Sequence, residues 1–105
     1  MQDQFAVWAT MEAREGKEAE AQAFLVEAAK RLESEPGTTS FRAMQTGPRD
    51  FAIFNSFVDE AALMAHIGGP VAAWVQSQNE ALFTAPYAIT KCQVFAAKRV
   101  GAEVA

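Results

Sequence analysis

Residues 4–13 alternate imperfectly between apolar and polar side chains and are rich in aromatic and β-branched types, a pattern that predicts a β-strand. One face of this strand carries Phe5, Val7, Ala9 and Met11. The other face carries Ala6, Trp8, Thr10 and Glu12. After Gly16 the spacing becomes that of an amphipathic helix over residues 17–35, whose apolar stripe is Ala21, Phe24, Leu25, Ala28 and Leu32.

The rest of the chain predicts three more strands and a broken helix. Residues 39–46 and 51–57 are predicted strands, and residues 47–50 form the tight turn between them. A helix is predicted over residues 59–67 with Asp59 near its N-cap, and the Gly-Gly-Pro sequence at 68–70 breaks it before a second piece that ends near Leu82. Residues 88–98 predict the last strand, and residues 99–105 predict a frayed tail.

The order of these elements is β-α-β-β-α-β, which predicts one α+β domain of the ferredoxin-like kind over residues 1–105. Its four-stranded antiparallel sheet carries the helices on one face and leaves the other face open. The first and third strands have large apolar residues on both faces, Trp8 and Phe54 among them. Because small proteins rarely expose a large apolar patch, we expect a homodimer in which two sheets face each other.

Composition and charge narrow the possible partners. The chain of 105 residues has a formal net charge of −4 and no cluster of Lys and Arg, which argues against nucleic acid and anionic membranes. Cys92 is the only cysteine, so an intrachain disulfide and a CxxC metal site are excluded. With no secretory signal pattern at the N-terminus and no apolar run of about 20 residues, the expected location is the cytoplasm.

His66 is the only histidine and the strongest candidate for chemistry. An imidazole can take a proton from a phenol or an activated C–H group near neutral pH. The alternative is a half-buried histidine whose hydrogen bond to a backbone carbonyl is purely structural. Asn55 is a polar residue in the middle of an apolar strand, so it needs a partner such as a ligand, His66 or the backbone.

Four further residues are candidate ligand contacts, each with a structural alternative. Trp8 and Trp74 could line an aromatic pocket or pack in the core or the dimer interface. Arg42 could stabilise an anionic intermediate or lie in solvent on its strand. Tyr87 could donate its hydroxyl to a pocket or close one end of the fold. Cys92 is predicted to be a small buried apolar residue rather than a nucleophile.

Two segments resemble the antibiotic biosynthesis monooxygenase family, and the likeness extends over about residues 4–98. They are FAIFNSFVDEAALMAHIGGP at 51–70 and LESEPGTTSFRAMQ at 32–45. The resemblance implies a dimeric α/β barrel with a pocket between sheet and helices in each subunit. It also implies an oxygenase that uses no metal, flavin or haem and oxidises small aromatic substrates such as anthrones or hydroquinones. Other branches of the family degrade haem or act on phosphorylated sugars.

The chain departs from the family pattern at two places. Asn55 stands where the family often has Glu, and the first strand lacks the Asn of the haem-degrading branch. Because the chain has no second histidine, haem degradation is not expected. Three hypotheses remain: a cofactor-independent monooxygenase with His66 as base, a non-catalytic module that binds a small apolar or aromatic ligand, and an isomerase or dehydratase on the same scaffold.

Overall fold

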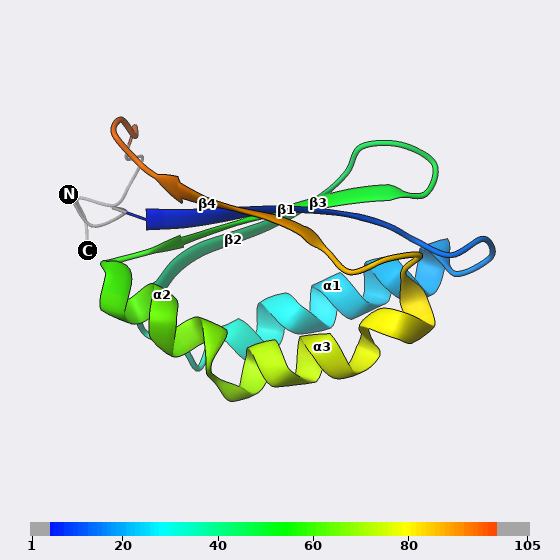
Figure 1. Cartoon of the computed structure of the whole chain (residues 1–105), viewed down its shortest axis with the longest axis horizontal. Helices are drawn as coiled ribbons and strands as arrows, with labels where there is room; N and C mark the ends of the chain where they lie inside the picture. The colour runs from blue at the N-terminus through cyan, green and yellow to red at the C-terminus, as the bar shows by residue number, and fades with distance from the viewer. Residues whose placement is uncertain (1–4, 99–105) are drawn as a thin grey trace.

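The computed structural model describes residues 5–98 and has the predicted order of strands and helices (Figure 1). The elements are β1 (Phe5–Glu12), α1 (Glu18–Leu32), β2 (Thr38–Gln45), β3 (Asp50–Phe57), α2 (Glu60–Ile67), α3 (Pro70–Leu82) and β4 (Ala88–Gln93). The sheet has the order β2-β3-β1-β4, and all its neighbouring strands are antiparallel. The predicted ferredoxin-like architecture is confirmed. The predicted tail at 99–105 lies outside the described residues.

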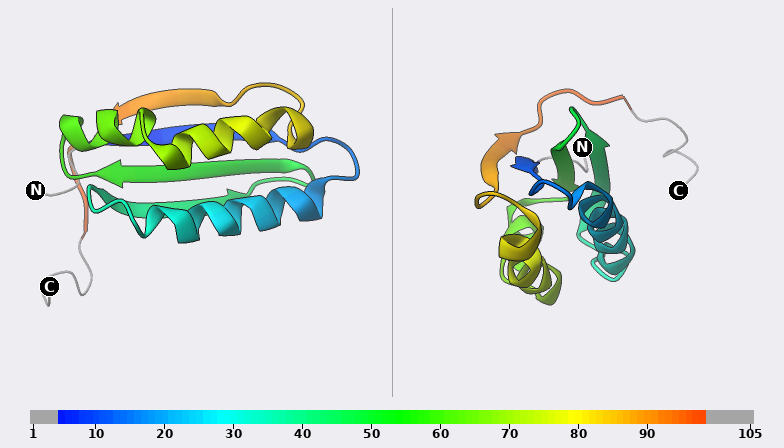
Figure 2. Two further views of the ribbon diagram at one scale, coloured as in Figure 1. Left: turned by 90° about the horizontal axis from the view of Figure 1, so that it is seen from below. Right: turned by 90° about the vertical axis from the view of Figure 1, so that its right-hand side faces the viewer.

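All three helices lie on one face of the sheet, as both views in Figure 2 show. The core fills the layer between the sheet and the helices. It is built from the apolar stripe of α1 and from the side chains of β1 and β3 that point toward the helices. Its buried members are Ala9, Met11, Ala13, Ala21, Phe24, Leu25, Phe51, Leu82 and Phe83. The period of two in β1 therefore separates a helix-covered face, with Ala9 and Met11, from an open face with Trp8 and Thr10.

Two predicted elements are shorter in the structure than in the sequence pattern. Helix α1 ends at Leu32 rather than at residue 35: the amides of residues 33–35 donate to carbonyls three residues back, in a tighter turn that leads into Pro36. Strand β4 ends at Gln93 rather than at residue 98. Its last pair with β1 joins Gln93 to Phe5, the residue at which β1 begins, so residues 94–98 have no β1 residue opposite them.

The turn between α1 and β2 packs directly against α2. A Cβ atom placed on Gly37 would lie 2.6 Å from the Cβ of Ala62, so only glycine fits at this position. The Gly37 carbonyl also accepts a hydrogen bond from the Val58 amide at 3.1 Å. At the start of α2, Oδ1 of Asp59 accepts from the Ala62 amide at 2.8 Å, which confirms the predicted N-cap.

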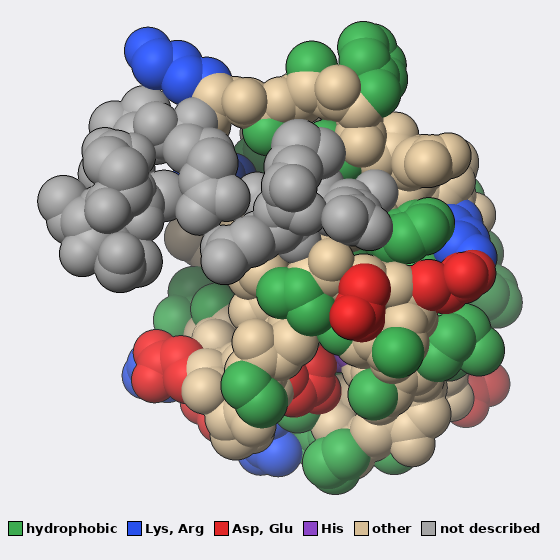
Figure 3. Space-filling model, turned by 90° about the vertical axis from the view of Figure 1, so that its left-hand side faces the viewer, with side chains coloured by type: hydrophobic (Ala, Val, Ile, Leu, Met, Phe, Trp, Pro, Cys, Tyr) green, Lys and Arg blue, Asp and Glu red, His purple; other side chains and the backbone are tan. Residues whose placement is uncertain are grey.

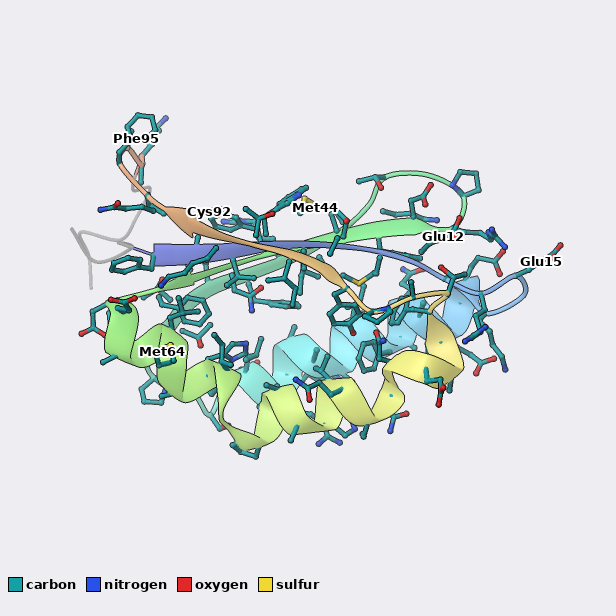
Figure 4. The ribbon with its side chains drawn as sticks, in the orientation of Figure 1. Glu12, Glu15, Met44, Met64, Cys92 and Phe95 are labelled. Carbon is teal, nitrogen blue, oxygen red and sulfur yellow. The ribbon has the colours of Figure 1, made fainter. Side chains whose placement is uncertain are left out.

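Large apolar side chains and one charged side chain lie next to each other on the open face of the sheet. Trp8, Phe54 and Arg42 lie side by side across β1, β3 and β2. Trp8 and Met44 are each 38% exposed, and Phe95, in the segment after β4, is 95% exposed. Figure 4 shows Met44 and Cys92 on the side of the sheet away from the helices. Among the helices of residues 5–98, none is long and apolar enough to cross a bilayer.

Candidate active site

The His66 side chain lies in the last turn of α2 and meets a carboxylate from the turn between α1 and β2. Its Nδ1 atom is 2.7 Å from Oε1 of Glu35, and the two side chains are only 15% and 16% exposed. The imidazole also packs on the ring of Phe57, with 5.2 Å between the ring centroids. Figure 3 looks onto this end of the molecule, where acidic side chains lie among hydrophobic ones. The histidine is thus half-buried, held by a carboxylate and not by a backbone carbonyl.

Glu35 is fixed by the turn that starts at it. The Thr38 amide donates to the Glu35 carbonyl at 3.1 Å, and the Thr38 hydroxyl donates to Oε1 of the Glu35 carboxylate at 3.0 Å. The other carboxylate oxygen, Oε2, is buried and has no hydrogen-bond partner within the described chain. It lies at the start of α3, 3.8 Å from where a Cβ on Gly69 would be. One carboxylate therefore touches both the end of α2 and the beginning of α3.

Asn55 lies on the same helix-facing side of β3 as Phe57, two residues or about 7 Å along the strand. Its side chain is only 3% exposed. Oδ1 of this amide has no hydrogen-bond partner in residues 5–98. A buried carbonyl oxygen without a donor is costly, so this position calls for a water molecule or a polar ligand group.

Trp74 and Tyr87 also lie on the helix side, packed against the core. The Trp74 ring is 4.9 Å from that of Phe24, and the Arg31 guanidinium covers it at 4.0 Å. This sandwich between α1 and α3 is a packing role. Tyr87 packs edge-on against Phe83 at 5.6 Å, and its buried hydroxyl has no partner in the part of the chain described. Burial raises the pKa of Tyr87 above its usual range, because the phenolate would lose its hydration.

Trp8 and Arg42 lie on the open face, so the sheet separates them from His66. The six candidate residues of the sequence thus fall into two groups. His66, Asn55, Trp74 and Tyr87 face the layer between sheet and helices, whereas Trp8 and Arg42 face away from it. Within one subunit, a ligand that touches His66 cannot also touch the second group.

Two surface cavities lie away from His66. A groove of about 280 Å³ runs between α1 and β2, and it is lined by Gln22, Leu25, Val26, Ala29, Phe41, Ala43, Met44, Gln45 and Phe51. A second cavity of about 400 Å³ lies where the β2–β3 turn approaches the segment before β4, with Glu12, Asp50 and Thr84 among its lining residues. Neither of these two cavities is lined by His66 or Asn55, so a ligand held in either of them would not contact these residues.

Within residues 5–98, no cluster of three His, Cys, Asp or Glu side chains is placed to hold a metal ion. Cys92 is half-buried on the open face, and its thiol lies 3.6 Å from the Thr90 carbonyl.

Sequence reasoning missed Glu35. Glu35 lies in the segment 32–45 that resembles the family and directly before Pro36-Gly37, where a turn was expected, but neither feature indicates a contact with His66. Its contact with His66 joins residues 31 positions apart. That contact depends on how closely the turn packs on α2, which no local pattern records.

Comparison with known proteins places the chain in a family. The model of the antibiotic biosynthesis monooxygenase family matches residues 4–78, so the chain belongs to this family. A structure of a protein of unknown function from Nitrosomonas europaea is 34% identical, with a TM-score of 0.89 over 94% of this chain and 96% of that one. A Mycobacterium tuberculosis protein is 22% identical, with a TM-score of 0.81 over 90% of this chain and 98% of the other. No curated protein matches the chain.

Proposed function

We propose that this protein is a cofactor-independent monooxygenase that oxidises a small aromatic or quinol-type substrate with O2, and that His66 is its general base. The observation that carries the proposal is the contact of 2.7 Å between His66 Nδ1 and the Glu35 carboxylate, inside the layer between sheet and helices. Membership of the monooxygenase family supports the reaction class. The unpaired Oδ1 of Asn55 on the same layer supports a polar ligand group there.

The chemistry needs only a base and a site that holds an anion. His66 would take a proton from a phenol or an activated C–H group, and the resulting electron-rich anion would react with O2. One oxygen atom enters the product and the other leaves as water, so both electron pairs come from the substrate. An anthrone, for example, becomes a quinone plus one water molecule. The protein's contribution is to form the anion and to hold it away from bulk water.

We also propose that two copies associate through their open faces. The half-exposed Trp8 on the inner strand β1, the half-exposed Met44 on the edge strand β2 and Phe95 after β4 form an apolar surface that a second copy would cover. The alternative function, a module that binds a small apolar ligand without chemistry, is favoured by the apolar groove between α1 and β2.

Oxygen uptake tests the catalytic proposal. Anthrones, hydroquinones and catechols are supplied to the wild type, to His66→Ala and to Met64→Ala, a control on an exposed position of the same helix. We expect uptake by the wild type and the control, and a fall of about a hundredfold in His66→Ala, equal to about 2.7 kcal/mol of barrier. Labelled O2 should place one oxygen atom in the product and one in water.

Two outcomes contradict the proposal. Equal uptake by wild type and His66→Ala removes His66 from the reaction. No uptake above the uncatalysed rate, together with saturable binding of the same compounds, supports the binding module instead.

A further inference from the structure

The contact between Glu35 and His66 specifies which nitrogen of the histidine can act. Building on the proposed function, we propose that Glu35 is a positioning residue. It holds neutral His66 in the tautomer with the proton on Nδ1, so that Nε2 is the atom that accepts the substrate's proton.

The first step of the argument is the chemistry of the pair. An ionised carboxylate can only accept hydrogen bonds, so an imidazole nitrogen 2.7 Å from it carries the proton of that bond. That nitrogen is Nδ1. Nε2 is then unprotonated in the neutral ring, and it has no hydrogen-bond partner within residues 5–98. This tautomer is the opposite of the one that predominates in free neutral histidine.

The second step concerns the charge on Glu35. Its buried Oε2 lies at the start of α3, whose N-cap residue Gly69 offers no side chain to the helix. The positive end of a helix dipole favours a negative charge, and α3 is 13 residues long. His66 lies in the last turn of α2, where the negative end of that dipole favours a donor. Near the break between the two helices, the Glu35 carboxylate thus lies at the positive end of α3, and His66 lies at the negative end of α2.

The third step is rigidity. The Thr38 hydroxyl bonds the same oxygen of Glu35 that receives His66, which fixes the carboxylate rotamer. Gly37 lies against Ala62, one helical turn before His66, and this contact sets the position of the turn along α2. Phe57 covers the imidazole ring from β3. A base whose rotamer is locked by its neighbours loses little freedom when the substrate binds.

Turnover provides one test. We expect Glu35→Gln, which keeps the shape but not the charge, to lower kcat at least ~10-fold and to leave KM nearly unchanged. Glu33→Gln, an exposed position two residues away, is the matched control and should behave as wild type. A purely structural role predicts a lower melting temperature with normal kcat for the folded enzyme, and that result overturns the proposal.

The decisive test needs no substrate. His66 is the only histidine, so nitrogen-15 labelling of histidine gives the signals of one imidazole, whose tautomer is assigned by NMR above neutral pH. We expect the Nδ1–H form in the wild type and in Glu33→Gln. We expect a shift to the Nε2–H form in Glu35→Leu, which has no acceptor.

The proposal is overturned if His66 of the wild type carries its proton on Nε2. It is also overturned if His66 still carries its proton on Nδ1 in Glu35→Leu. If Glu35→Leu does not fold, the wild-type tautomer alone decides. An Nδ1–H wild type that consumes no oxygen with any substrate would show that the proposed function, and not the role of Glu35, has failed.

Discussion

The two faces of the sheet contrast most clearly at Phe54 and Asn55, consecutive residues of β3. Phe54 points to the open face and is half-buried, whereas Asn55 points to the helices and is 3% exposed. An aromatic ring is thus left partly in solvent while an amide is fully enclosed. Energetics predict the reverse, because burial favours the ring and penalises an unpaired amide. The proposed dimer and the proposed ligand site would account for this difference, the first by covering the ring with an apolar surface and the second by giving the amide a polar partner.

The hydroxyl groups of the open face reinforce this contrast. Ser56, on the open face of β3, is buried at the sheet surface and its Oγ bonds to the hydroxyls of Thr39 and Ser40 in β2. On the covered face, Oδ1 of Asn55 is without a donor in the described chain. The open face therefore satisfies its buried polar groups internally. The covered face leaves several polar atoms of the described residues without a partner, the Asn55 Oδ1 and the Tyr87 hydroxyl among them, and such atoms call for a water molecule or a ligand group.

Among the substitutions that test this contrast, a charge at the centre of the open face should have the largest effect. Trp8→Glu should raise the dimer dissociation constant at least ~30-fold, because a central aromatic at an interface contributes about 2 kcal/mol or more. Light scattering over a dilution series measures it. Met64→Glu is the control, since Met64 is exposed on α2 and away from the open face (Figure 4). A wild type that stays monomeric at micromolar concentration would contradict the proposed association through the open faces.

A pair of substitutions at neighbouring residues should have opposite effects. Asn55→Leu replaces an unpaired buried amide, so the free energy of unfolding should stay level or rise, while substrate turnover falls. Ser56→Ala removes the partner of two hydroxyls and should cost about 1 kcal/mol with turnover retained. Urea unfolding and oxygen uptake measure both. Loss of stability in Asn55→Leu would show that the amide is satisfied within the fold.

The smallest effect concerns the ionisation of Tyr87 on the covered face. Burial raises the pKa of Tyr87 in the folded protein, so its hydroxyl should stay protonated through the pH range where an unfolded tyrosine ionises, near 10. The chain has one tyrosine, so the increase in near-ultraviolet absorbance that accompanies ionisation of a phenol reports Tyr87 alone. Its contribution to stability should be constant below pH ~10 and should decrease above it, because only the unfolded chain ionises readily. Native titration near pH 10 would place the hydroxyl in water.

The order of the elements was predictable because it depends on local patterns. The change from period two to helical spacing at Gly16, the Asp59 cap and the Gly-Gly-Pro break all appear in the structure as the sequence predicted. From this order the ferredoxin-like sheet followed, but not which face of β1 would meet the helices: Trp8 was a candidate for the pocket as well as for the dimer interface, and it lies on the open face. The ends of α1 and β4 were less predictable, since β4 stops where its pairing with β1 stops.

The site was predictable only in part. His66 and Asn55 stood out by residue type, but the pattern could not tell that Arg42 would lie on the opposite face from both. Which face of a strand points toward the helices depends on how three strands pair, and no local sequence pattern gives that register. Glu35 was missed for a related reason: it is one of many glutamates in α1 and the turn after it, and only packing against α2 distinguishes it.

The chain has two tryptophans, and the sheet places them in separate environments. Trp8 lies on the open face, while Trp74 is enclosed between Phe24 and Arg31. Indole fluorescence depends on the polarity and mobility of its surroundings, so Trp8 would report the proposed assembly and Trp74 the packing of the helices. Single Trp→Phe substitutions would make each signal readable alone, and dilution would change the emission of Trp8 while that of Trp74 stays constant.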